Sequence, residues 1–443
     1  MARAISALLS ACILGLTGTA SAETLGEALG IAEASNPQLD IERTNQQIAE
    51  EQLIAARGAR LPTVEFTGQY GPETIQTNRA IVLDQGGRQI GTASLSAVQP
   101  LYAGGRIRAG IREAQASIGS SAARLDAATQ DTILQAVTAY VDVRQDREAI
   151  KIQQNSVSLL TEQLRASRDR FDVGEITRTD VALAEARLEG ARASLAAAEA
   201  QARASEASYQ IIIGRDPGNL VAPPPISVVP SSFDEALAIA LDESPDIAEA
   251  EFGERAAEQR VRSVRSRLLP ELNVVVSAAF QGTLNQEDTV NPFGPDPTTP
   301  QPVPDFLDRS VSAFAQARIP LYQGGVARSQ VRSAKLERAQ AQLNIEAVRR
   351  QTIANVSQSW ASYQAALIGI EASRRQVEAA EIAYEGGQEE LSVGVRTTLD
   401  VLDQEQDLLE ARLSLVQSER DAYVAASQLF RAMGTLSPRR YGF

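Results

Sequence analysis

The 443-residue sequence contains no histidine and only one cysteine. Histidine is the commonest general base and a frequent zinc ligand, so its absence excludes His-dependent catalysis and the usual zinc sites. Aromatic residues make up only 5% of the chain, and no acid has a base, nucleophile or pocket signature beside it. We therefore predict that the protein is not an enzyme, has no catalytic residue and binds no metal or cofactor.

Long apolar runs are missing as well: after the N-terminal leader, no stretch of about 18 apolar residues could form a transmembrane helix. The leader itself has Arg3, an apolar run from Ala4 to Leu16 and small residues before Glu23. This pattern predicts a signal peptide over residues 1–22. Cys12 also fits a lipoprotein cleavage box, but the apolar segment before it is short, so we favour cleavage after residue 22.

Basic residues are fewer than acidic ones, 42 against 56, which gives a formal net charge of −14. An acidic surface disfavours nucleic acid, and no basic aromatic groove is evident. Nucleic acid is therefore not an expected partner.

The chain after the leader consists of two tandem repeats of one sequence unit. The first parts match at an offset of 208 residues, for example Leu61-Pro62 with Leu269-Pro270, and the later parts at 220, for example Pro100 with Pro320. We assign residues 23–225 to the first repeat, 226–434 to the second and 435–443 to a short tail. The extra twelve residues fall in the Pro-rich segment 289–308, which we expect to be an exposed loop at the extracellular tip of the second hairpin.

Each repeat contains two segments of alternating apolar and polar residues, which predict β-hairpins at about 62–100 and 270–320. One apolar face would include Val64, Phe66, Leu95, Ala278 and Val311. The alternation fits strands of a membrane β-barrel with a water-filled interior. For each strand taken alone, a soluble antiparallel sheet explains the same alternation better. Because small barrels need about eight strands, four strands would require several chains to close one.

The remaining sequence predicts helices, including long helix pairs at about 105–214 and 325–434, with shorter helices before each hairpin. In the second helix of the first pair, apolar residues recur at steps of three and four for three heptads, and its copy does so in part. Such spacing indicates coiled-coil packing, although an ordinary long bundle would show it too.

The turn between the two helices of each pair carries the same motif, Val-Gly-x-x-Thr-x-x-Asp-Val, at residues 173–181 and 393–401. A glycine that ends one helix and a Thr-x-x-acid capping box that starts the next explain this pattern structurally. Asp180 and Asp400 each fit either helix capping or a role in a lumen. Asp400 and Asp403 lie three residues apart and share a helix face, and Asp403 lies beyond the cap positions, so it is the stronger candidate for a lumen site.

Arginines cluster where helices meet strands, and they include Arg60, Arg106, Arg267 and Arg328. If the strands lie in a membrane, these residues share one interface and can bind anionic lipid head groups. The alternative is that arginines complement helix C-termini, which does not account for those at helix starts.

Together the duplication, the Leu-Pro and Pro-Leu-Tyr-x-Gly-Gly motifs and the two turns resemble the TolC family of outer-membrane efflux and secretion channels. The resemblance covers essentially the whole chain after the leader. It implies an α plus membrane β fold, in which a tandem-duplicated homotrimer shares a 12-stranded outer-membrane barrel and continues as a long coiled-coil helical barrel in the periplasm. The expected function is an exit duct of a tripartite efflux or type I secretion system.

The resemblance also implies a gate at the periplasmic tip, where a basic residue and two acids match Arg396, Asp400 and Asp403, and the neighbouring helix matches Thr179 and Asp180. This chain has Leu391 where the best-known gate has a tyrosine. The turns at Gly174 and Gly394 would meet a periplasmic adaptor, which connects to an inner-membrane pump of the ABC or RND type.

Two other functions compete with this interpretation. A periplasmic coiled-coil adaptor or scaffold would explain the helices but not the four alternating segments. A hydrolase that uses only carboxylates would not require the duplication.

Overall fold

The computed structural model describes residues 23–74, 87–226, 229–284 and 306–441. The predicted signal peptide with Cys12 and nearly all of the predicted extracellular loop lie outside these residues. The described residues form two compact units, one drawn from 23–43, 124–247 and 348–441 and the other from 44–123 and 248–347. Each unit therefore combines segments of both sequence repeats.

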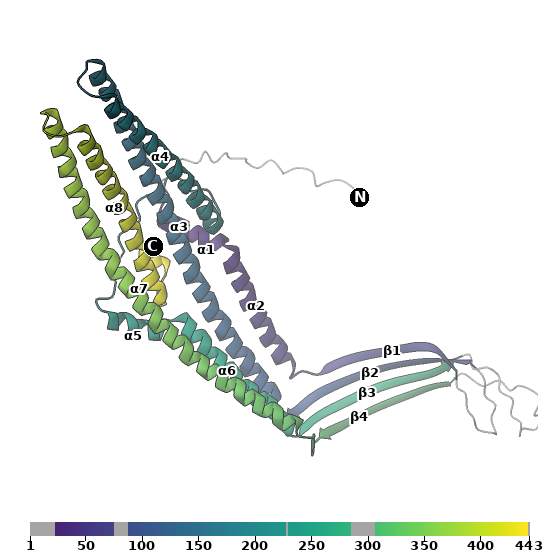
Figure 1. The fold of residues 1–443 in the computed structure, drawn as a ribbon. Coiled ribbons are helices and arrows are strands. Elements are labelled where there is room, and N and C mark those ends of the chain that lie inside the picture. Colours follow the sequence, from purple (N-terminus) through teal and green to yellow (C-terminus); the bar gives the residue numbers. More distant parts are fainter. Residues whose placement is uncertain (1–22, 75–86, 227–228, 285–305, 442–443) are drawn as a thin grey trace, which may run out of the picture. The chain divides into compact units, whose positions relative to one another are not determined.

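The second unit contains the β-sheet, and its four strands confirm the predicted hairpins (Figure 1). They are β1 (Thr63–Thr74), β2 (Gly87–Ala103), β3 (Glu271–Leu284) and β4 (Phe306–Arg318), antiparallel in the order β1-β2-β3-β4. The register pairs Phe66 with Leu95, Leu95 with Ala278 and Ala278 with Val311. Because paired residues share a face, the predicted apolar positions form one continuous surface across the sheet. Val311 on this surface is 80% exposed.

Strand β2 ends in the Pro-Leu-Tyr-x-Gly-Gly motif, and its register shifts between Pro100 and Tyr102. Proline has no backbone N–H to donate, so an irregularity at this position is expected. Gly104 follows with φ 59°, and a Cβ atom there would lie 2.9 Å from the carbonyl oxygen of Ser266. The first glycine of the motif therefore permits both a left-handed turn and a close backbone approach.

The helices also match the predicted spans. The long pairs are α3 (Arg106–Asp172) with α4 (Arg178–Ile213), and α7 (Val326–Ser392) with α8 (Thr398–Ala432). The shorter helices are α1 (Leu25–Ser35), α2 (Pro37–Gly58), α5 (Phe233–Glu243) and α6 (Pro245–Arg265), with 3-10 turns η1 (Ser266–Leu268) and η2 (Pro438–Tyr441). Helices α2 and α6 begin at proline, whose fixed φ suits the first helical position. Among the described residues, no helix combines the length and the apolar composition that a membrane crossing requires.

The larger hydrophobic core lies in the first unit and includes the fully buried side chains of Tyr140, Tyr209 and Phe430. A smaller cluster lies toward the turns of the helix pairs. It joins Leu160 and Leu164 of α3, Ala184, Leu188 and Ala191 of α4, and Leu402 of α8. The predicted heptad positions of α4 therefore pack against both of these helices.

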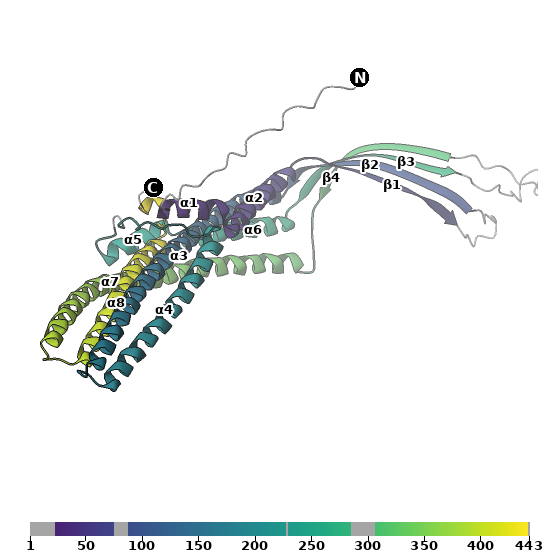
Figure 2. The same cartoon turned by 90° about the horizontal axis from the view of Figure 1, so that it is seen from above.

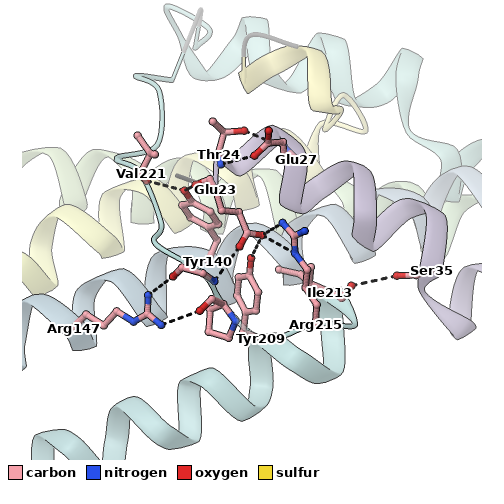
Figure 3. Close-up of polar contacts among 12 residues, drawn as sticks. Glu23, Thr24, Glu27, Ser35, Tyr140, Arg147, Tyr209, Ile213, Arg215 and Val221 are labelled. Atoms are coloured by element: carbon pink, nitrogen blue, oxygen red, sulfur yellow. Dashed lines mark hydrogen bonds and ion pairs between the residues drawn. The ribbon is translucent and has the colours of Figure 1, made fainter. Parts of the chain in front are cut away.

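A buried carboxylate anchors the start of the described chain (Figure 3). The Glu23 side chain is 5% exposed and accepts hydrogen bonds from the Tyr209 hydroxyl at 2.5 Å and the Gly218 amide at 3.2 Å, while Arg215 lies at 2.6 Å. Tyr140 donates to the Glu23 carbonyl oxygen at 2.8 Å, and burial raises its pKa to about 12. Glu23 thus fixes the chain before α1 to helices α3 and α4.

Candidate functional site at the helix turns

Two turns with the same construction join the helices of each long pair, and both lie at the same end of the four helices (Figure 2). Gly174 and Gly394 have φ values of 81° and 77°, a left-handed conformation that glycine adopts without strain. Their amides donate to the carbonyl oxygens of Phe171 and Leu391. The turns also expose apolar side chains, with Val173 at 72% and Val393 at 74%.

The predicted capping boxes are present in both turns. Thr177 and Thr397 are the N-caps, and their side chains accept from the amides of Asp180 and Asp400. Each aspartate in return accepts from the backbone and hydroxyl of its threonine, and these hydrogen bonds lower the pKa of both carboxyl groups. Asp180 and Asp400 are therefore helix caps that keep a charged, solvent-facing carboxylate.

Arg396 lies in the second turn and its Nε pairs with the carboxylate of Glu390, in the last turn of α7. Within one chain it thus folds back onto its own helix pair. Thr179 and Asp180 are on the other pair, at the first turn of α4, where Thr179 is exposed. A bond from Arg396 to these residues in a neighbouring chain remains a prediction.

Asp403 has a partner that the sequence did not reveal. The Arg187 guanidinium of α4 donates to the Asp403 carboxylate of α8 at 2.5 Å. The pair lies beside the smaller apolar cluster, since Leu188 and Leu402 are the sequence neighbours of the two residues. In the internal repeat, position 403 corresponds to Leu183 and position 187 to Asp407, so each charge occurs in only one repeat.

Glu405, two residues further along α8, is the buried acid of this region. Its side chain accepts from the Ser156 hydroxyl of α3 at 3.0 Å. Burial raises its pKa, against the opposing effects of the Ser156 hydrogen bond and the Arg187 charge. It lines a groove between α3, α7 and α8 together with Tyr384 and Arg412, which pairs with Glu381 at 2.8 Å.

These side chains can attract cations, repel anions and hold the two helix pairs together. Asp400 supplies an exposed carboxylate, Asp403 a carboxylate compensated by Arg187, and Glu405 an acid held between helices.

The four predicted lipid-interface arginines lie in the second unit. Arg60 lines a groove between α2 and α3, and Arg328 lines another beside the exposed Leu321 and Tyr322. Arg106 lies 3.8 Å from the Glu271 carboxylate, and Arg267 donates to Gln330 at 2.8 Å. The junctions are thus rich in arginine but contain one acid, Glu271, at the start of β3.

A sequence profile described as "Outer membrane efflux protein" matches residues 28–215 and 236–435, one segment in each repeat. The chain belongs to the outer membrane efflux protein family. The family's BepC of Brucella suis is 32% identical over 440 residues, which cover 99% of this chain and 91% of BepC. Outer membrane protein TolC of Escherichia coli is 24% identical over 447 residues, or 99% of this chain and 87% of TolC.

The fold agrees with solved channels of the outer membrane. The structure of the CmeC outer membrane channel of Campylobacter jejuni superimposes with a TM-score of 0.77 at 16% identity, over 93% of this chain and 85% of CmeC. As a member of the outer membrane efflux protein family, the protein is located in the outer membrane, extends into the periplasm and serves as an exit duct for export. The resemblance stated from the sequence is confirmed.

Proposed function

We propose that three copies of this chain form a passive export duct that is gated at its periplasmic tip. Four strands from each copy would close a shared 12-stranded barrel in the outer membrane, and the long helices would continue it as a helical barrel in the periplasm. The four-stranded sheet presents a continuous apolar face that is exposed in the single chain, which supports this arrangement. Because small barrels need about eight strands, one chain is too few to close a barrel.

The gate consists of Arg396, Asp400 and Asp403 on the second helix pair and of Thr179 and Asp180 on the first. The observation that carries this assignment is that both capped turns, which lie at the same end of the helices, carry acidic side chains, and that Asp400 and Asp403 are exposed. Threefold repetition would bring the acids of α8 together as rings around the duct. Arg396 in this arrangement bonds the neighbouring copy and holds the second helix pair inward.

The exposed turns at Gly174 and Gly394 are the proposed contacts for a periplasmic adaptor, and the adaptor would connect the duct to an ABC-type or RND-type pump. Exposed valines at both turns support a docking role, since apolar side chains at a tip gain from being covered by a partner. A photo-crosslinking residue at Val173 or Val393 should capture the adaptor in cells.

Channel recordings of the purified protein in planar bilayers test the gate. Arg396→Ser should increase single-channel conductance, and Asp400→Asn with Asp403→Asn should weaken cation selectivity and block by divalent cations. Asp407→Asn, at an exposed position one turn further along the same face of α8, tests whether the effect extends beyond the gate. If the intact double variant keeps the selectivity and block of the parent, the constriction lies elsewhere. Recovery of a monomer from the soluble periplasm would instead contradict the duct itself.

A further inference from the structure

A groove of about 790 Å³ lies between the end of α2 and the start of α3, next to the residues that precede β1. Four arginines line it: Arg57, Arg60, Arg108 and Arg112. Its apolar lining includes Ile54 and Leu61, which are 58% and 63% exposed. The groove is thus both cationic and apolar, and all of it belongs to one compact unit.

Within the described residues, no acidic side chain compensates the charges of this groove. None of the four arginines forms an ion pair with another described residue, and no acid lines the groove. By contrast, arginines on α6 in the same unit have acidic partners, as Arg262 does with Glu258 at 2.7 Å and Arg260 with Glu337 at 3.4 Å. Unpaired like charges repel one another, so an anion in the groove would be stabilised.

Two of these arginines also lie at an unfavourable end of a helix. Arg108 and Arg112 are in the first two turns of α3, whose first turn contains no acid. The N-terminal end of a helix carries partial positive charge and favours anions over cations. Helix stabilisation therefore does not explain these two residues, whereas Arg57, in the last turn of α2, does complement the helix dipole.

We propose that this groove binds one anionic phospholipid, with the phosphate held by Arg57, Arg108 and Arg112 and an acyl chain lying along Ile54 and Leu61. Guanidinium groups bind phosphate oxygens through paired N–H donors, which suits a fixed lipid site better than diffuse charge does. The apolar lining favours a lipid over free phosphate. The groove adjoins β1, so this proposal rests on the proposed insertion of the strands in the membrane.

The test is native mass spectrometry of the detergent-purified full chain, titrated with phosphatidylglycerol or phosphatidylcholine. We compare the parent, Arg57→Gln with Arg112→Gln, and a control with Arg262→Gln and Arg375→Gln. The control loses the same charge from two exposed arginines, each paired with an acid four residues earlier. Because a basic residue near a lipid head group contributes about fivefold in affinity, the groove variant should bind phosphatidylglycerol about 30-fold more weakly.

The control should bind phosphatidylglycerol as the parent does, and phosphatidylcholine should bind weakly to all three. Equal loss in both variants would mean that overall charge attracts the lipid, and the site would be wrong. Competition by millimolar inorganic phosphate would identify an anion site without an acyl chain, which also overturns the proposal. A loss of trimer without a change in lipid binding would make the groove a subunit contact. Conductance of the same samples reports separately on the proposed duct, whatever the lipid result.

Discussion

Removing the guanidinium of Arg187 should make the duct more selective for cations. In each chain Asp400 and Asp403 contribute two negative charges and Arg187 one positive charge, so Arg187→Gln changes the local net charge from −1 to −2. Three copies would then carry six net negative charges in place of three. The substituted side chain is only partly exposed, but its ion pair is open to solvent, so we expect little effect on stability.

The size of the effect follows from Coulomb's law. For a monovalent cation about 6 Å from each unmasked carboxylate, the attraction in water is about 0.7 kcal/mol per charge, or about 2 kcal/mol for three. Salt at about 0.15 M roughly halves this value, because the Debye length is then about 8 Å. The remaining 1 kcal/mol or so corresponds to roughly a fivefold higher cation-to-anion permeability ratio.

Reversal potentials in planar bilayers measure this ratio directly. Arg192→Gln is the matched control, since Arg192 also lies on α4 but pairs with Glu189 of its own helix at 2.6 Å. The increase should disappear when Asp403→Asn is combined with Arg187→Gln, and it should grow as the salt concentration falls. If Arg187→Gln leaves the ratio unchanged while Asp400→Asn lowers it, Asp403 does not face the ion path. An increase that survives Asp403→Asn would assign the effect to another acid.

Three further predictions concern stability. Glu405→Gln should raise the denaturation midpoint near pH 7 and flatten its pH dependence. Burial raises the folded-state pKa of Glu405. The contribution of this side chain to the free energy of unfolding is therefore full below the ordinary pKa of 4.5, and it is lost as pH rises through the raised pKa. Equal slopes of stability against pH in the two proteins would contradict this. Gly119→Ala should lower the free energy of unfolding by about 1 to 3 kcal/mol through overpacking, because its Cβ would lie 2.4 Å from the Phe252 ring. Gly110→Ala on the same helix meets open space, so it should be neutral or stabilising. Urea titration compares the two variants. Glu23→Ala should cost about 2 kcal/mol because it leaves buried donors unpaired, and a thermal melt that matches the parent would show that the cluster contributes nothing.

Local sequence patterns predicted the helices and strands of this fold. The contacts that they missed join residues far apart in the sequence. The capping boxes at Thr177 and Thr397 depend on residues three apart, and the strand faces depend on alternate residues, so both could be read directly. The Arg187 and Asp403 pair joins positions 216 residues apart, and no spacing rule relates such positions. Comparison of the repeats offered one signal, because both charges break the internal symmetry where Asp400 and Asp180 preserve it.

The burial of Glu23 could not be predicted from the sequence either, because its partners are also distant in the chain. From the sequence, Glu23 was only the residue that follows the predicted signal peptide. Its partners are the side chains of Tyr209, near the end of α4, and Arg215, just after α4. The packing of α1 against the first long pair and the backbone pairing of Glu23 with Asn219 and Val221 bring them together, and both join residues far apart in the sequence.

The sheet has a consequence for how the protein matures. In the described part of the chain β1 and β4 are its outer strands, 12 and 13 residues long, and each has one side without a pairing strand. Such open edges bind other strands readily, whether correct or incorrect. In the proposed trimer these edges would pair with strands of neighbouring copies, so a single copy would carry open edges until it assembles. Folding of the β-region and subunit association would then be coupled, and the stability of the β-region would depend on protein concentration.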